Sequence, residues 1–170
     1  NTTTLDGNYA LNINAGTGTN AAVTLGTIGS GVGTAPQSLT VSAIGTGTTT
    51  LNGNITTVND LNLSAATDVN LGGAVTLTSN RGDVYLNGGA VDDTGAFDLV
   101  LAANAGDIHL GTMGATALDS LTVNAAGTAF LDGDITTTAA TGIVMSGSTN
   151  VALTDDVALN SGGNPINLGG

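Results

Sequence analysis

A short alternation of apolar and polar residues returns along the whole chain and limits what it can fold into. In each triplet two apolar residues flank a third, mostly polar, residue, so that both apolar side chains fall on one face of an extended strand. Gly, Asn and Asp separate the triplets, as expected for turns. The triplets are 11–13, 23–25, 39–41, 61–63, 69–71, 75–77, 84–86, 99–101, 108–110, 121–123, 151–153, 157–159 and 166–168. This pattern predicts an all-β fold built from very short strands.

Similar segments also recur at a regular spacing. The sequence numbers of Leu39 and Leu61 differ by 22, as do those of Leu99 and Leu121 and those of Leu121 and Ile143. A period of this size, with several short strands in each period, is typical of a β-solenoid. In such a fold every strand pairs with its counterpart in the next coil, so short strands are sufficient. We therefore predict a parallel β-helix.

A longer repeat is superimposed on the short one. Ser38–Val41 returns as Ser120–Val123, an offset of 82 in sequence number, and Leu51–Thr57 returns as Leu131–Thr137, an offset of 80. At about four coils per repeat, this arrangement predicts about eight coils, with both ends of the chain at nearly the same phase of the repeat. The predicted organisation is one continuous solenoid over residues 1–170, with internal repeats at approximately 5–86 and 87–168.

The alternative architecture is a pair of β-sandwiches, one for each long repeat. Regular strand spacing is compatible with that fold. However, a sandwich core usually contains several large aromatic residues, and this chain has two Tyr, two Phe and no Trp. The short period that relates Leu39 to Leu61 also has no natural place in a sandwich.

The charge and composition exclude several classes of function. Thirteen acidic residues, all Asp, stand against a single basic residue, Arg81, and the net charge is −12. Nucleic-acid binding and a polybasic membrane footprint both need positive charge, so neither partner is expected. No apolar run reaches the roughly 18 residues of a spanning helix, so no membrane insertion is expected. With 8% charged residues and a mean hydropathy of +0.29, the chain is expected to fold.

The repeated blocks resemble the repeats of very large bacterial surface exoproteins. The resemblance lies in Leu39–Ala43, Leu51–Thr57 and Val69–Gly73, and again in Leu121–Ala125 and Leu131–Thr137. These are the blocks of the filamentous-haemagglutinin-like and related giant β-helical adhesins. The resemblance implies secretion to the bacterial cell surface, a right-handed parallel β-helix, and an adhesive or filament-forming role.

Few side chains are candidates for chemistry, and no catalytic or cofactor-binding residue is predicted. His109, the single histidine, falls between two apolar strand residues and is expected to point outward. Arg81-Gly-Asp83 matches a tripeptide that integrins recognise in other proteins, but a tripeptide often arises by chance, and the turn explanation is favoured. The chain is therefore not expected to be an enzyme.

Calcium is the only metal that the sequence brings into consideration. Calcium binds several converging oxygen ligands, and paired Asp residues near the C-terminus could supply them. The candidate ligands are Asp132, Asp134, Asp155 and Asp156. The alternative is that Asp suits turn geometry and keeps the molecules apart through like charge.

The function predicted from these observations is a structural segment of a secreted surface filament or adhesin stalk. Its partner is expected to be itself, through stacking at ends formed by Leu5, Ile166 and Leu168, or through adjacent repeats of the same chain. The first alternative is an adhesive module that recognises glycan or protein on a host or neighbouring cell. More remote alternatives are a polysaccharide-degrading β-helix with paired carboxylates and an ice-binding solenoid with threonine ladders at 48–50 and 136–138.

Overall fold

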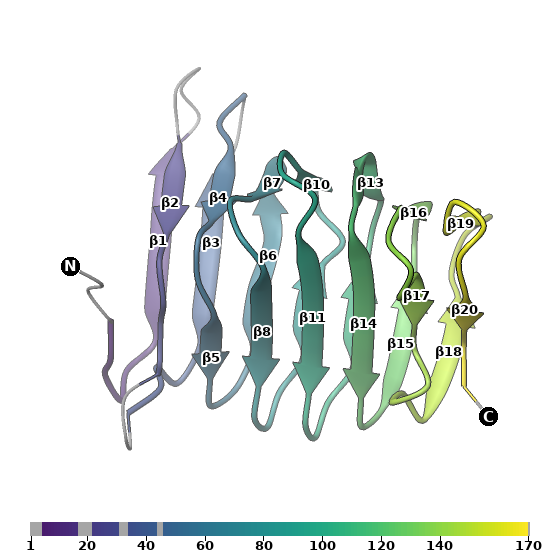
Figure 1. The fold of residues 1–170 in the computed structure, drawn as a ribbon. Coiled ribbons are helices and arrows are strands. Elements are labelled where there is room, and N and C mark those ends of the chain that lie inside the picture. The colour runs from purple at the N-terminus through teal and green to yellow at the C-terminus, as the bar shows by residue number, and fades with distance from the viewer. Residues whose placement is uncertain (1–4, 17–21, 31–33, 44–45, 170) are drawn as a thin grey trace.

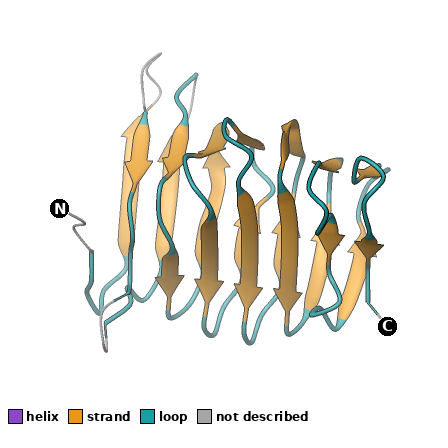
Figure 2. Ribbon diagram, viewed as in Figure 1, coloured by secondary structure: helices purple, strands orange, loops and turns teal. Residues whose placement is uncertain are grey.

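The computed structural model describes residues 5–16, 22–30, 34–43 and 46–169, so residues 1–4, 17–21, 31–33, 44–45 and 170 of the predicted unit lie outside the described residues. The described chain is an all-β solenoid, and it contains no helix (Figures 1 and 2). The two termini lie at opposite ends of the coil (Figure 1). All pairings between named strands are parallel. The predicted parallel β-helix is confirmed, and the β-sandwich alternative is wrong.

Three parallel sheets form the sides of the solenoid. Sheet 1 consists of β1 (Leu11–Gly16), β3 (Leu39–Ala43), β6 (Leu61–Ala66), β9 (Val84–Leu86), β12 (Ile108–Leu110), β15 (Thr128–Leu131) and β18 (Asn150–Leu153). Sheet 2 consists of β2 (Val23–Leu25), β4 (Thr49–Leu51), β7 (Asp68–Leu71), β10 (Ala90–Asp93), β13 (Met113–Leu118), β16 (Ile135–Thr137) and β19 (Leu159–Asn160). Sheet 3 consists of β5 (Ile55–Thr57), β8 (Val75–Ser79), β11 (Asp98–Ala103), β14 (Ser120–Ala125), β17 (Ile143–Val144) and β20 (Ile166–Asn167).

Each coil passes through sheets 1, 2 and 3 in that order. Six coils are complete, from β3, β4 and β5 to β18, β19 and β20. An incomplete coil precedes them, in which β1 and β2 are followed by Ile28 in place of a strand. Ile28 makes isolated parallel bridges to Leu5 and Ile55, which lie on the same side of the solenoid. The prediction of about eight coils is therefore wrong.

The error in the number of coils comes from equating the long repeat with whole coils. Ser38–Val41 includes the start of β3 in sheet 1, whereas its copy Ser120–Val123 lies in β14 in sheet 3. Likewise β4 corresponds to β15, and β7 corresponds to β18. In each case the copy lies eleven strands further along the chain, which is three coils and two strands. The long repeat is thus one strand short of four coils, and its second copy lies on a different side of the solenoid.

Contacts between coils are nevertheless preserved in both copies. A Cβ atom on Gly53 would lie 2.7 Å from the backbone nitrogen of Thr27 in the coil before it. The matching glycine, Gly133, faces Thr112 in the same way, and its Cβ atom would lie 2.6 Å from the Thr112 nitrogen. Both glycines therefore mark a close approach of two coils at a corner, although the two corners lie on different sides.

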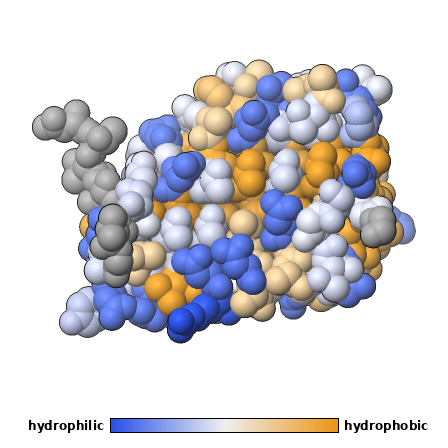
Figure 3. All heavy atoms as spheres, turned by 60° about the horizontal axis from the view of Figure 1, so that its bottom comes forward, coloured by the Kyte–Doolittle hydropathy of each residue, from blue (hydrophilic) through white to orange (hydrophobic). Residues whose placement is uncertain are grey.

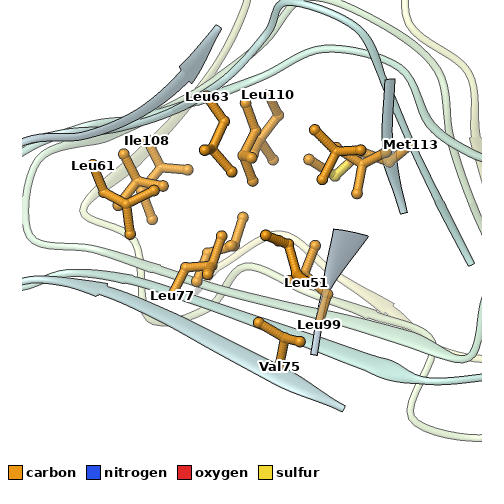
Figure 4. Packing of buried hydrophobic residues seen from close by; sticks show 14 of the residues in the cluster. Leu51, Leu61, Leu63, Val75, Leu77, Leu99, Ile108, Leu110 and Met113 are labelled. Carbon is orange, nitrogen blue, oxygen red and sulfur yellow. The ribbon is translucent and has the colours of Figure 1, made fainter. Parts of the chain in front are cut away.

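The core is formed by columns of apolar side chains that run along the solenoid. In most strands alternate residues point inward, and side chains from all three sheets meet there, for example Leu61, Leu51 and Leu77 (Figure 4). In sheet 3 one column continues through every coil by strand register. Its buried members are Ile28, Ile55, Leu77, Leu101, Val123 and Met145, which are between 0% and 3% exposed. Burial of such side chains contributes about 1.5–3 kcal/mol each and holds neighbouring coils together.

Candidate functional site

Three aromatic rings stack on the outer face of sheet 1. Tyr85 in β9, His109 in β12 and Phe130 in β15 occupy the same register position in consecutive coils. The Tyr85 and His109 ring centroids are 4.7 Å apart with an angle of 10° between planes, and those of His109 and Phe130 are 4.8 Å apart with an angle of 11°. The residues on either side of each ring point into the core, so the rings lie on the outside. We call these three residues the aromatic strip.

The aromatic strip gathers most of the chain's rings at a place where the core does not need them. The whole sequence contains two Tyr, two Phe and one His, while the core consists mainly of Leu, Val and Ile. The step in sequence number is 24 from Tyr85 to His109 and 21 from His109 to Phe130, and this irregularity hid the column in the sequence. One feature of the sequence could have predicted the column. Each ring is the central residue between two apolar residues, in 84–86, 108–110 and 129–131.

A column of carboxylates borders the aromatic strip where its strands begin. Asp60 Oδ1 accepts a hydrogen bond from the Asp83 backbone N–H at 3.0 Å, and Asp83 Oδ1 accepts one from the Asp107 N–H at 2.8 Å. Asp107 Oδ1 in turn accepts from the Thr128 N–H at 2.6 Å. A Cβ atom on Gly106 would lie 2.4 Å from Asp83 Oδ1, so the preceding glycine makes room for the carboxylate. Each carboxylate thus joins one coil to the next at this corner.

The Tyr85 hydroxyl connects the aromatic strip to this carboxylate column. It donates a hydrogen bond to Asp83 Oδ2 at 2.7 Å. This bond raises the pKa of Tyr85 to about 12, with further contributions from burial and from the negative charges of Asp83, Asp60 and Asp107. Each of these effects favours the neutral phenol over the phenolate. The strip therefore lies in a region of negative electrostatic potential.

Polar groups also border the strip where its strands end. Asn87 directly follows β9 and Asp132 directly follows β15. The Asn87 side-chain amide donates to Asp132 Oδ2 at 3.1 Å. The coil between them contributes Gly111 at this position, which has no side chain to separate them. The aromatic strip consequently has a carboxylate at both ends of its strands.

The Arg81-Gly-Asp83 tripeptide lies in the turn between β8 and β9. Arg81 is exposed, as an integrin-recognition motif would require. The Asp83 carboxylate, however, accepts hydrogen bonds on both oxygens, from the Tyr85 hydroxyl and from the Asp107 N–H. The arrangement supports the turn interpretation, because this carboxylate is already engaged within the protein.

Three of the four candidate calcium ligands line one shallow surface depression, namely Asp134, Asp155 and Asp156. Asp132 instead faces Asn87 beside the aromatic strip. Within the described part of the chain, no three His, Cys, Asp or Glu side chains form a group that could hold a metal ion. The calcium prediction gains no support from this arrangement.

Asp134 has a backbone role that requires no metal. Its Oδ1 accepts a hydrogen bond from the Ala158 N–H at 2.8 Å. In the first copy of the long repeat, Asn54 Oδ1 accepts the corresponding bond from the Thr76 N–H, also at 2.8 Å. Because an uncharged amide makes the same contact, the Asp134 carboxylate is explained as a link between coils.

The threonine triplets do not present a continuous threonine surface. The central residues, Thr49 and Thr137, are fully buried. The outward column that passes through Thr50 continues with Asn70 and then Asp92. Threonine is therefore lost from this column after Thr50, which does not match a flat ladder for ice binding.

The predicted assembly residues lie at the two ends of the solenoid. Leu5 begins the inward column of sheet 3, where it bridges Ile28. At the other end, Val144 pairs with Asn167. The next residues in this register are the buried Met145 and, in the last coil, Leu168. Leu5 and Leu168 are 50% and 43% exposed, whereas the column between them is buried.

The other large exposed apolar side chains share this location. Among the described residues, all of them lie in the first or the last coil: Leu5, Tyr9, Leu153, Ile166 and Leu168. Along the sides, hydrophobic and hydrophilic residues are interspersed on the face drawn in Figure 3. The large exposed apolar side chains of the described structure thus lie where a column lacks its next coil.

The described residues include no helix that is long and apolar enough to cross a membrane. No protein-family model, curated protein or solved structure matches the chain.

Proposed function

We propose that this chain is a structural β-solenoid segment of a secreted bacterial surface filament or adhesin stalk. Its end coils stack on those of a second copy or of an adjacent repeat of the same chain. The observation that carries the proposal is the inward column of sheet 3. It passes through every coil, and its outermost members, Leu5 and Leu168, are half exposed.

Stacking of one more coil would complete this column at either end. The outermost apolar side chain at each end of this column is half exposed, whereas its counterparts in the middle coils are buried. A further coil would bury it as well. The end strands β18, β19 and β20 also present a parallel edge, which favours pairing with another strand. The added coil belongs either to a second copy or to an adjacent repeat of the same chain.

Sedimentation velocity of the 170-residue chain over a range of concentrations, followed by electron microscopy, tests the proposal. We expect association into filaments whose coils repeat every ~4.8 Å along the axis. We expect Leu168→Lys to abolish association, because a charge in the end column cannot be buried without a partner. Added salt should strengthen association of the unmodified chain, because it screens the repulsion between copies of net charge −12.

Val100→Lys is the matched control. Val100 lies in sheet 3, points outward in a middle coil, and pairs laterally with Thr76 and Thr122. This variant makes the same apolar-to-lysine change away from both ends, so it should still associate. Association that survives Leu168→Lys, or single particles of the unmodified chain at every concentration and salt, would contradict end-to-end stacking.

An adhesive module that recognises glycan or protein is the second candidate function. The observation that favours it is the aromatic strip, because aromatic rings gathered on the outside contribute little to a core of aliphatic residues. A binding role predicts that replacing Phe130 removes recognition and leaves association unchanged. A purely structural role predicts that the same replacement affects stability alone.

A further inference from the structure

The last ring of the aromatic strip has one face that no other ring covers. One face of Phe130 stacks on His109, and the other lies toward Ala152 in the next coil. Alanine ends at Cβ and cannot cover a six-membered ring. A flat group placed above Ala152 would therefore extend the stack by one position.

The charges around the strip determine which flat group fits. Asp83 and Asp107 precede the strands of Tyr85 and His109, and Asp132 follows the strand of Phe130. These three carboxylates, with Asp60 at the start of the carboxylate column, make the electrostatic potential of this region negative. An anionic ligand is excluded by this potential, and a cationic one is attracted to it.

A guanidinium group meets both requirements. It is planar, so it stacks on an aromatic face, and it carries a positive charge with five N–H donors in a fixed arrangement. Carboxylates accept such donors in charge-assisted, often paired, hydrogen bonds. A lysine ammonium has the charge without the plane, and a neutral sugar has hydroxyl donors without the charge.

We propose that the aromatic strip is a docking surface for an arginine-bearing segment of a partner protein, with Asp83, Asp107 and Asp132 contributing negative charge around it rather than direct contacts. The guanidinium stacks on the open face of Phe130 and is attracted by the charge of Asp132, whose Oδ2 accepts from Asn87 on the opposite side of the ring. This inference sharpens the adhesive candidate function, and it does not depend on end-to-end stacking.

The single histidine makes a direct test possible. Because the chain contains only His109, its imidazole signals in a carbon–proton NMR spectrum report on the strip alone. We would titrate the Leu168→Lys variant, whose last coil is blocked, with acetylated and amidated tetra-arginine, tetra-lysine and tetra-citrulline. We expect a saturable shift with tetra-arginine, affinity about tenfold weaker with tetra-lysine, and no shift with the planar but uncharged tetra-citrulline.

Two substitutions separate stacking from general electrostatic attraction. Phe130→Ala removes the open ring and should weaken tetra-arginine binding about tenfold, while Asp132→Asn removes one charge and keeps the oxygen that accepts from Asn87. The matched control is Asp92→Asn, which removes one charge from β10 in sheet 2. We expect Asp132→Asn to weaken binding at least about threefold more than Asp92→Asn. Circular dichroism of each variant checks that the fold is retained.

Three outcomes would overturn the proposal. Equal binding of tetra-arginine and tetra-lysine would show only a diffuse attraction to negative charge. Equal effects of Asp132→Asn and Asp92→Asn would place the binding elsewhere. A shift of the His109 signals by a neutral glucan oligomer, without one by tetra-arginine, would assign the strip to a glycan instead. Because all titrations use the end-blocked variant, none of these results depends on whether the unmodified chain stacks.

Discussion

At the scale of single residues, the interior of the solenoid contains a few hydroxyl groups that differ in how well they are paired. Thr57 Oγ1 donates to the Asn59 carbonyl at 2.6 Å, and Ser79 Oγ donates to the same carbonyl at 2.8 Å. The buried hydroxyls of Thr49 and Thr137 find no hydrogen-bond partner among the described residues. A buried hydroxyl without a partner costs about 1–3 kcal/mol. These two threonines are therefore places where the core can be improved.

Thr49→Val should stabilise the protein by about 1 kcal/mol, because valine has nearly the same shape and removes the unpaired hydroxyl. The measurement is the free energy of unfolding from urea titration followed by circular dichroism. Thr57→Val is the matched control, since it makes the same change at an equally buried position that does have a partner. It should destabilise by about 1 kcal/mol, and equal effects of the two substitutions would refute the explanation.

The Tyr85 hydroxyl gives a prediction about pH. In the folded protein its pKa is about 12, above the ordinary value of 10.0. The unfolded chain therefore releases this proton first as the pH rises, and the folded state binds it more tightly. The contribution of Tyr85 to stability is full below pH 10 and is lost as the pH rises from 10 towards 12.

A Tyr9→Phe background leaves Tyr85 as the only tyrosine, so that phenolate absorbance follows this one group. We expect half-ionisation near pH 12 in the folded protein. Asp83→Asn should bring the pKa back towards 10, because it weakens the hydrogen bond that contributes most to the shift and removes the nearest negative charge. A Tyr85 titration unaffected by Asp83→Asn would contradict this account.

At the scale of strands and corners, much of the architecture could be predicted, because alternation along a strand reflects burial directly. The triplets at 39–41, 84–86 and 121–123 all lie in strands with buried ends. The number of coils could not be predicted in the same way. Sequence similarity identifies equivalent strands, but it does not show how many strands make one coil. Here the long repeat contains eleven strands and each coil contains three, so the repeat is not a whole number of coils.

The candidate site was harder to predict than the fold. The three rings of the aromatic strip are separated by unequal numbers of residues in the sequence. They align in one register only because the corners between their strands differ in length. Asp83 and Asp107 each follow a glycine, which was a usable signal for a repeated corner. The contact between Asn87 and Asp132 spans two coils and depends on the missing side chain of Gly111. Only the fold reveals that contact.

Gly106→Ala tests how closely the corners are packed. The added Cβ atom would lie 2.3 Å from the Gly82 carbonyl oxygen and 2.4 Å from Asp83 Oδ1, so the backbone or the carboxylate must move. We expect a loss of about 1–3 kcal/mol in the free energy of unfolding. The control is Gly73→Ala, in another corner, where a Cβ atom would meet nothing within 4 Å. If both variants lose the same stability, the corner does not depend on this close contact.

At the scale of the whole molecule, stability is distributed along one dimension. Each coil pairs its strands with the coils before and after it, so a middle coil has two paired neighbours and an end coil has one. The inward column of sheet 3 shows this directly, since Leu101 is fully buried and Leu168 is 43% exposed. The two ends are therefore the places where the coil should open first and where a further coil adds most.

Leu101→Ala and Leu168→Ala make the same change in the same column and should have different consequences. Leu101→Ala leaves a cavity between two coils and should cost about 2–5 kcal/mol. At low protein concentration, Leu168→Ala should cost about 1 kcal/mol or less, because much of its side chain is already in water. Amide hydrogen exchange should show the same gradient, with the fastest opening in the first and last coils.

Protein concentration then separates a free end from a stacked one. If copies stack, the end coil gains a neighbour, and binding to the folded state adds stability that grows with concentration. The cost of Leu168→Ala should therefore rise with concentration towards that of Leu101→Ala, while the cost of Leu101→Ala stays nearly constant. Urea unfolding at a series of protein concentrations measures both. A cost for Leu168→Ala that remains small at every concentration would leave each solenoid with an open end and would refute stacking.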